Sequence, residues 1–409
     1  MKNKWILLFS HFVIITFLTG CGSQKELTDI AIVTALGIDK DENGMYVGTF
    51  QIVNPTNVAG GLQGGSAGEG TAVTVYTATG KNIVDVSRRA SIKVSRLLYY
   101  AHTNLVVVSE DIAREDGISN ILDALDRDVQ FRTTTNFAIA RNAKAADILS
   151  IVTPIDKIPA KKAIENLKFS EKKWGGNIIV NVREIIEDLT TTGKEPVIPG
   201  YAAEGNLEAG KQLENLHYTS PKATIHAAGL GVFKGDKLIN WVDEYDGIGI
   251  VWILDKVKEA NITVDWKESK DAISYQVMRD NIKVSYELDD SIPNFSIYIR
   301  VKGDLGEVDA PININDRKIQ AEIEKKLEKK IKEKIQFAIK LAQQNKTDIF
   351  GFGEKIYRSN PDTWKTLNQD WNDERFPEIK VKITVDASIL RTGLKTNPFL
   401  FQMDQKQKK

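Results

Sequence analysis

The chain has 409 residues, of which 42% are apolar and 27% are charged, a composition typical of globular proteins. Its 55 Lys and Arg residues balance 55 Asp and Glu residues, which argues against nucleic acid as a partner, because phosphate binding needs a clustered basic excess. A single cysteine excludes an intramolecular disulfide and a cysteine-based metal cluster. At about 100–200 residues per domain, the length predicts two or three domains.

The first 20 residues are predicted to be a secretory signal peptide. Lys2 and Lys4 precede a mainly apolar stretch from Trp5 to Leu18, and small residues follow. A positive start, a medium apolar run and a small-residue exit are the features of such a signal. The apolar stretch is short for a helix that spans a bilayer, which needs about 20 residues, so we expect the segment to be removed.

The residues at the predicted cleavage site resemble the lipobox of bacterial lipoproteins. That pattern is Leu, a small or polar residue, Gly or Ala, and then Cys, and this chain has Leu18, Thr19, Gly20 and Cys21. The resemblance implies cleavage between Gly20 and Cys21, an S-diacylglycerol group on the Cys21 sulfur and an acyl group on its new amino terminus. Two acyl chains are enough for stable membrane anchoring, whereas one is not.

Residues 21–200 are predicted to form an α/β-type domain, a sheet with helices against one face, because strand and helix patterns alternate. The expected strands are 29–38, 45–53, 71–77, 104–109 and 133–140. The expected helices are 82–98, 111–126, 144–151 and 181–189. The Asn-Gly pair within 41–44 predicts a hairpin between the first two strands. The glycine-rich segment 58–70 is expected to be a mobile loop.

A domain boundary is predicted where Pro, Gly and Ala accumulate, over residues 193–214. We place the linker at 201–222 and a second domain at 223–400. The strand patterns expected in the second domain are a hairpin over 223–241 that turns at 235–236, a pair of strands over 272–288 that turns at 279–281, and single strands at 295–303 and 378–390. The tail, 401–409, is expected to be disordered.

One long helix over 315–345 is the clearest secondary-structure prediction. Isoleucine or leucine recurs every fourth residue from Ile319 to Ile339, as in an amphipathic helix. Between residues 315 and 346 the sequence has ten basic and five acidic residues. We expect these charged side chains to form the solvent-exposed side of the helix. The alternative is that the basic excess attracts anionic lipid. The predicted fold class is therefore α+β and multi-domain, with mixed sheets packed with helices and a C-terminal domain built around this long helix.

The sequence offers little for catalysis or metal binding. The segment 64–68 matches G-x-S-x-G around Ser66, but it lacks the strand and helix that a nucleophile elbow requires. His102, His217 and His226 lack the spacing of a metal site, so neither a metal nor another cofactor is expected. Trp364 and Trp371 are candidates for a partner surface, although core packing is the preferred interpretation.

Several motifs, in order along the chain, resemble the Ger(x)C family, the C-subunit lipoproteins of bacterial spore germinant receptors. They are Glu26-Leu27, Ala35-Leu-Gly-Ile-Asp39, Leu98-Tyr-Tyr-Ala-His102, Leu125-Asp-Arg-Asp128, Gly231-Val-Phe-Lys-Gly235, Asp348-Ile-Phe-Gly-Phe-Gly353 and Pro361-x-x-Trp364. Family members often carry Trp after the lipidated Cys, whereas this chain has Gly22.

This resemblance implies a non-enzymatic subunit held by its lipid anchor on the outer face of the spore inner membrane. It implies assembly with an A and a B membrane subunit into a complex that senses nutrients and triggers germination. The alternative is a solute-binding lipoprotein of a transporter, which predicts a deep cleft between domains. A third hypothesis is a lipid-anchored hydrolase that uses Ser66.

Overall fold

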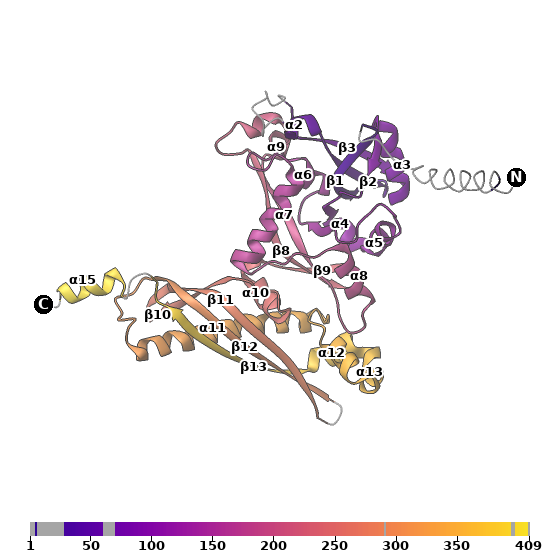
Figure 1. Ribbon diagram of the computed structural model, residues 1–409. Coiled ribbons are helices and arrows are strands. Elements are labelled where there is room, and N and C mark those ends of the chain that lie inside the picture. Colours follow the sequence, from indigo (N-terminus) through magenta and orange to yellow (C-terminus); the bar gives the residue numbers. More distant parts are fainter. Residues whose placement is uncertain (1–4, 6–27, 60–69, 290–291, 394–396, 408–409) are drawn as a thin grey trace.

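The computed structural model describes residue 5 and residues 28–59, 70–289, 292–393 and 397–407. The structure does not describe the predicted signal peptide apart from Trp5, the lipobox residues Leu18 to Cys21, or Ser66 of the hydrolase hypothesis. Two mixed sheets, each with its own helices, form an upper and a lower unit in Figure 1. The predicted α+β class with several packed layers is confirmed.

The first sheet has parallel strands at its centre and antiparallel strands at both edges. Its order is β3-β2-β1-β5-β6-β7-β8-β9, with β4 paired to the start of β1. Strands β1, β5, β6 and β7 run parallel, and the remaining neighbours along this order are antiparallel. The strands are β1 Ile30–Lys40, β2 Tyr46–Val53, β3 Val73–Gly80, β4 Leu97–Tyr99, β5 Leu105–Ser109, β6 Asn136–Ala140, β7 Val197–Gly205, β8 Ala223–Lys234 and β9 Lys237–Val242.

Helices cover both faces of this sheet, so the prediction of one covered face is wrong. Along β5, Val106 and Val108 enter one apolar core while Leu105 and Val107 enter a second core on the other face. The first core also takes side chains from α3 Ile83–Lys93, α4 Glu110–Glu115, α5 Ser119–Asp126 and α8 Val182–Thr190. The second core takes them from α6 Ala145–Ser150 and α7 Pro159–Phe169. A strand buried on both faces reads as a continuous apolar run, as β5 does.

A buried carboxylate fixes α6 against the end of β1. Asp39 accepts hydrogen bonds from the backbone N–H groups of Ala145 and Ala146 at 2.8 and 3.0 Å. Burial raises the pKa of Asp39, and these two donors act in the opposite direction. A Cβ atom on Gly37 would lie 3.1 Å from Leu149 and 3.3 Å from the Ala145 carbonyl carbon. The motif from Ala35 to Asp39 is therefore explained by close helix–strand packing.

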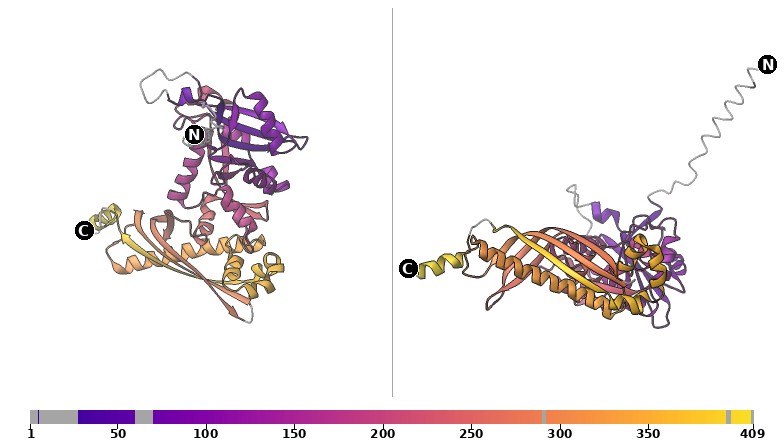
Figure 2. Two further views of the ribbon diagram at one scale, coloured as in Figure 1. Left: turned by 45° about the vertical axis from the view of Figure 1, so that its right-hand side comes forward. Right: turned by 90° about the horizontal axis from the view of Figure 1, so that it is seen from below.

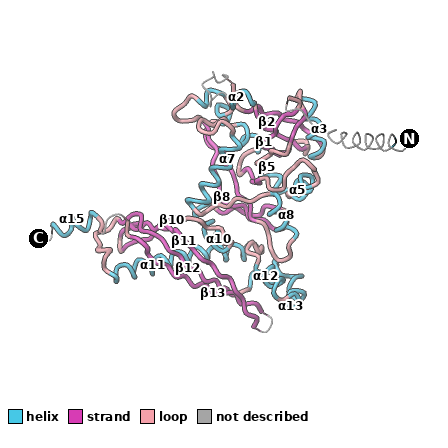
Figure 3. The backbone as a smooth tube through the Cα atoms, in the orientation of Figure 1, coloured by secondary structure: helices cyan, strands magenta, loops and turns pink. Residues whose placement is uncertain are grey.

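The second sheet has the order β10-β11-β12-β13 and carries one very long helix. Its elements are β10 Ala260–Trp266, β11 Ser269–Asp289, β12 Ile292–Val308, α11 Arg317–Gln344 and β13 Lys380–Arg391. Strands β12 and β13 are parallel and the other pairs antiparallel. Figure 2 shows α11 lying along one face of this sheet, and Figure 3 shows the length of the β11–β12 pair. The predicted helix at 315–345 is confirmed with slightly shorter bounds.

Residues 279–281 do not form the predicted turn, because β11 continues through them as one strand of 21 residues. The pairing with β12 shifts register between Val277 and Arg279. The polar triplet therefore follows a β-bulge, which adds a residue to a strand without ending it.

The residues predicted as a linker, 201–222, join two neighbouring strands of the first sheet. They include the end of β7, the short helix α9 Leu207–Gly210 and a 3₁₀ turn at Leu213–Leu216. The hairpin β8–β9 turns at the predicted Gly235 but extends the first sheet, not the second. The chain passes to the second sheet after β9, through helix α10 Glu244–Ile253.

Other element boundaries also differ from the predictions. The helix expected over 82–98 ends at Lys93, and β4 follows it. The helix expected over 111–126 is two helices separated at Gly117, whose φ of 86° belongs to the left-handed region. Most of the tail expected to be disordered lies in α15 Phe399–Gln407. Short helices not predicted from the sequence are α2 Pro55–Ala59, α12 Phe352–Ser359, α13 Pro361–Leu367 and α14 Phe376–Glu378.

Helix α10 is buried on all sides and connects the two units. Every residue from Gly247 to Ile253 is buried, and α10 contacts β8 of the first sheet as well as β11 and α11 of the second unit. Lys334 of α11 donates a hydrogen bond of 2.8 Å to the Tyr245 carbonyl oxygen. Gly249 allows this approach, because a Cβ there would lie 2.2 Å from the Lys334 carbonyl oxygen.

We expect Gly249→Ala to lower the free energy of unfolding by about 2 kcal/mol. The added methyl group meets backbone, which cannot rotate away, and overpacking of this kind costs about 1–3 kcal/mol. Urea denaturation followed by tryptophan fluorescence measures the change. The control is Gly306→Ala, whose Cβ would meet only the flexible Gln276 side chain, at 3.2 Å. Equal midpoints for Gly249→Ala and wild type would contradict the close contact.

Candidate functional site

None of the residues predicted to carry the lipid anchor lies in the described ranges. The lipobox at Leu18, Thr19, Gly20 and Cys21 therefore remains a prediction, and so does the inference that Ser66 is not a catalytic nucleophile.

Among the described residues, no group of His, Cys, Asp and Glu could hold a metal ion. His102 packs against Tyr99 with tilted rings whose centroids are 5.7 Å apart. His217 follows a 3₁₀ turn and His226 lies in β8.

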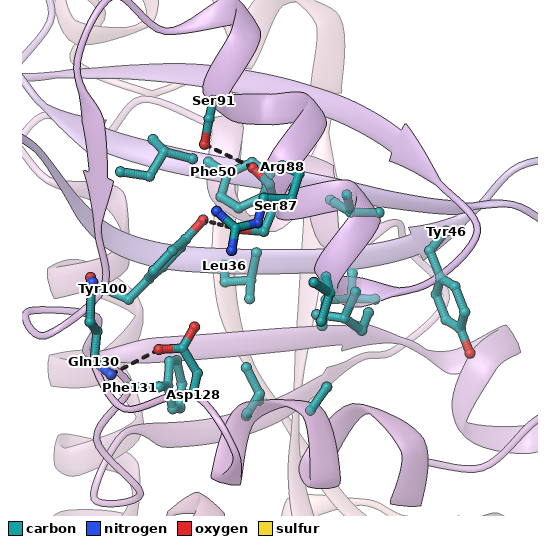
Figure 4. Close-up of a pocket in the computed structure, with 18 of the residues that line it drawn as sticks. Leu36, Tyr46, Phe50, Ser87, Arg88, Ser91, Tyr100, Asp128, Gln130 and Phe131 are labelled. Atoms are coloured by element: carbon teal, nitrogen blue, oxygen red, sulfur yellow. Dashed lines mark hydrogen bonds between the residues drawn. The ribbon is translucent and has the colours of Figure 1, made fainter.

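A pocket of about 180 Å³ in the first unit is the candidate site. It lies between α3, the strands β1, β2 and β4, and the end of α5 with the loop that follows (Figure 4). Its floor is apolar, from side chains that also belong to the first core. The apolar lining includes Leu36, Ile38, Phe50, Ile83, Val86, Leu98, Leu125 and Phe131.

Most polar side chains of this pocket lie on one side of it, and Tyr46 lies apart from them (Figure 4). The Ser87 Oγ and Tyr100 hydroxyl oxygens are 2.7 Å apart and share a hydrogen bond. Burial raises the pKa of Tyr100 to about 12, so its phenol is protonated at neutral pH. Asp128 accepts a hydrogen bond of 2.8 Å from the backbone N–H of Gln130. Figure 4 shows Arg88 beside the Ser87–Tyr100 pair.

One polar atom at the pocket has no partner in the part of the chain that the structure describes. The Gln130 side-chain oxygen Oε1 is buried and accepts no hydrogen bond there. A buried acceptor without a donor costs about 1–3 kcal/mol. A ligand with an N–H or O–H group placed at this atom would satisfy it.

The pocket has the form of a binding site. Its polar lining consists of two serines, two tyrosines, Arg88, Asp128 and Gln130. An apolar floor with a few polar groups is the usual form of a small-molecule site. The sequence motifs at 98–102 and 125–128 contribute Tyr100, Leu125 and Asp128 to the pocket. No motif in the sequence indicated that Ser87 and Arg88 belong to a binding site.

A second cluster, around Asp348, organises the junction of the two units. Its buried carboxylate accepts hydrogen bonds from the N–H groups of Phe350, Phe352 and Gly353 at 3.2, 3.2 and 2.7 Å. The indole N–H of Trp371 donates a fourth, at 2.9 Å. Burial raises the pKa of Asp348 to about 6, and the four donors oppose that effect.

The Asp348 cluster binds the first unit through main-chain contacts. The Asp348 carbonyl oxygen accepts from the Glu195 N–H at 2.9 Å, and the Glu354 N–H donates to the Gly193 carbonyl oxygen at 3.0 Å. Trp364 and Trp371 are each 3% exposed and pack edge to face. These tryptophans belong to the core, as the preferred interpretation had it, and offer no exposed partner surface.

Comparison with known proteins gives matches over nearly the whole chain. Residues 23–202 match the family model for the spore germination protein N-terminal domain, and residues 228–393 match the model described as spore germination B3/GerAC like, C-terminal. Spore germination protein KC of Bacillus subtilis (strain 168) is 40% identical over 403 residues, which cover 98% of this chain and 99% of that protein.

More distant relatives match over similar lengths. Spore germination protein B3 of the same organism is 23% identical over 397 residues, covering 93% of this chain and 96% of that protein. The crystal structure of the GerBC protein matches with a TM-score of 0.54 at 19% identity, over 87% of this chain and 96% of that one. This structural match shows a shared fold.

We expect Asp348→Ala to lower the free energy of unfolding by more than about 3 kcal/mol, because four buried donors lose their acceptor. Asp348→Asn keeps the volume of the side chain and removes its titratable carboxyl group. With a pKa raised from 3.8 to about 6, the native state holds the proton more tightly than the unfolded state. Wild type should therefore lose stability relative to the Asn variant as pH rises from 4 to 7. Parallel stability curves would contradict the raised pKa.

Tyr100→Phe should cost about 1 kcal/mol of stability, because Ser87 loses its buried partner. Thermal unfolding at pH 7 measures this change. Tyr99→Phe is the matched control, since Tyr99 is a half-buried neighbour whose hydroxyl makes no hydrogen bond within the described residues. Equal losses in both variants would show that the Ser87–Tyr100 hydrogen bond does not stabilise the pocket.

Proposed function

Because the chain belongs to the Ger(x)C family of spore germination proteins, we propose that it is the lipid-anchored C subunit of a nutrient germinant receptor. In this proposal it lies on the outer face of the spore inner membrane and assembles with the A and B membrane subunits. The observation that carries the receptor role is the match to spore germination protein KC at 40% identity over 98% of the chain.

The anchor is the acylated Cys21. Leu18-Thr19-Gly20-Cys21 supports it, and Cys21 is the single cysteine of the chain. Within the described ranges, no helix is long and apolar enough to cross a bilayer. Two acyl chains of about 15 methylenes each, at about 0.8 kcal/mol per methylene, give a gross membrane affinity of about 24 kcal/mol as an upper bound.

The contribution of this subunit is assembly and signalling rather than catalysis. Confining it to the membrane plane raises its effective concentration beside the A and B subunits, so weak contacts between them are sufficient. The pocket under α3 supports a binding role, because it combines an apolar floor with a few polar groups.

A solute-binding lipoprotein of a transporter is the second candidate, and the pocket is the observation in its favour. The pocket lies within the first unit, however, and not between the two units, where that function predicts a cleft. That role predicts direct affinity for a nutrient by the protein alone. Isothermal titration calorimetry of the purified mature chain with amino acids, sugars and nucleosides distinguishes the two functions. Tight binding by the isolated chain would favour the transporter role.

We expect Cys21→Ala to abolish membrane fractionation and to weaken the nutrient response of spores strongly. The alanine removes the sulfur that receives the diacylglyceryl group and so releases the chain from the bilayer. Immunoblots of membrane and soluble fractions, with germination followed by loss of optical density, measure both effects. The control is Ser23→Ala, which leaves the lipobox intact. A full response from a soluble Cys21→Ala chain would contradict the anchor's role.

A further inference from the structure

Helix α3 exposes apolar side chains where a surface helix normally carries polar ones. It buries Val86 and Ala90 against the first sheet. At about 100° per residue, Arg88 is attached on the opposite side of the helix, and Val84 and Ile92 lie about 40° to either side of it. The Arg88 side chain reaches back over the edge of the pocket, beside Ser87 and Tyr100 (Figure 4). Val84 is 59% exposed and Ile92 85% exposed. Leu97, just beyond the helix, is 45% exposed.

The same surface is basic. Between Lys81 and Leu97 the chain has five basic residues and one acidic residue, Asp85. Arg89 is paired with Asp85 at 3.0 Å. In contrast, Arg88 and Arg96 are exposed and make no hydrogen bond or ion pair within the described part of the chain. We call Val84, Arg88, Ile92, Arg96 and Leu97 together the α3 face.

The α3 face lies where the chain enters the folded body. Leu97 is paired with Ile30, the first residue of β1, and its backbone N–H donates to the Asp29 carbonyl oxygen at 2.9 Å. Thr28 is only seven positions after Cys21 in the sequence. Seven residues span at most about 25 Å even when fully extended. An acyl group on Cys21 would therefore hold this end of the protein close to the bilayer surface.

We propose that the α3 face rests on an anionic lipid surface. Val84, Ile92 and Leu97 enter the boundary between headgroups and acyl chains, and the guanidinium groups of Arg88 and Arg96 bind lipid phosphates. Exposed apolar side chains combined with unpaired cations are the features of helices that lie in a membrane interface. The inference rests on the proposed anchor for its geometry, but the chemistry of the face belongs to the described residues.

This contact orients the body on the membrane. An anchor at Cys21 alone limits only the distance from the bilayer, whereas a second attachment through α3 also fixes which side faces the bilayer. Val84, Arg88 and Leu97 also line the pocket under α3. The proposed contact therefore places the entrance of that pocket at the lipid surface.

The test measures binding of the mature chain to lipid vesicles without its acyl anchor. The mature chain with Cys21→Ser is mixed with vesicles of phosphatidylcholine alone or of equal parts phosphatidylcholine and phosphatidylglycerol, and sedimented. We expect binding to the anionic vesicles that falls at least tenfold between 50 and 300 mM salt, since ionic attraction is screened. Equal binding to both vesicle types, or none to the anionic ones, overturns the proposal.

Matched variants assign the binding to this face. Ile92→Glu with Arg96→Glu should weaken binding at least tenfold. Tyr357→Glu with Lys365→Glu makes the same charge change on exposed residues of α12 and α13 and should leave binding unchanged. Equal loss in both pairs would overturn the assignment. Circular dichroism verifies that each variant is folded.

A spectroscopic readout shows insertion directly. The substitution Ile92→Cys is introduced into the Cys21→Ser chain, and an environment-sensitive fluorophore is attached to this single thiol. The emission of the fluorophore should shift to the blue when anionic vesicles are added. The control is the same fluorophore at Asp362→Cys on α13, whose emission should not shift.

If vesicle binding is absent while spores with Ile92→Glu and Arg96→Glu germinate poorly, the α3 face contacts a protein and the lipid proposal is wrong. Because acylation is not used, these results are independent of the Cys21→Ala experiment.

Discussion

The arrangement of the two units depends on one helix, α10, most of which has no solvent side. From Gly247 to Ile253 this helix is apolar and buried on all sides, so it is stable only while both sheets pack against it. Gly249 lets α11 approach its backbone, and Lys334 binds the carbonyl oxygen of Tyr245. One continuous apolar core consequently runs from the first sheet through α10 to the second, and separation of the units would expose it to water.

The Asp348 cluster closes the same junction at a second point. Its carboxylate collects four donors from its own loop and from Trp371, and the loop in turn meets residues 193–195 of the first unit. A Cβ on Gly353 would lie 2.6 Å from Trp364, which explains a glycine there. The two units are therefore joined at two points, through α10 and through the Asp348 cluster. The contact that orients this body on the membrane is the one we assign to the α3 face.

The elements that could be predicted from the sequence are those whose pattern of apolar and polar residues is compatible with only one kind of secondary structure. The hairpin of β1 and β2 has an Asn-Gly turn between apolar strands, and α11 buries the isoleucines and leucines that recur every fourth residue. Helix α10 could not be predicted in this way, because a helix buried on all sides has no apolar periodicity and its two glycines suggest a loop.

Other errors have equally specific causes. The polar residues 279–281 resemble a turn, yet they follow a bulge in β11. Pro199 suggests a linker, yet it lies within β7, where it pairs with Leu230 of β8. The pocket was not predicted, because its lining joins α3, β2 and α5 from separate parts of the sequence. The exposure of Val84 and Ile92 is also a tertiary property, since their spacing alone is compatible with a buried stripe.

The central claim is that the chain reaches the membrane through Cys21. Mass spectrometry of the protein isolated from spore membranes tests it most directly. The account predicts an N-terminal tryptic peptide that begins at Cys21, ends at Lys25 and carries the mass of a diacylglyceryl group and an N-acyl chain. An unmodified Cys21, or a leader still attached to it, would contradict the account.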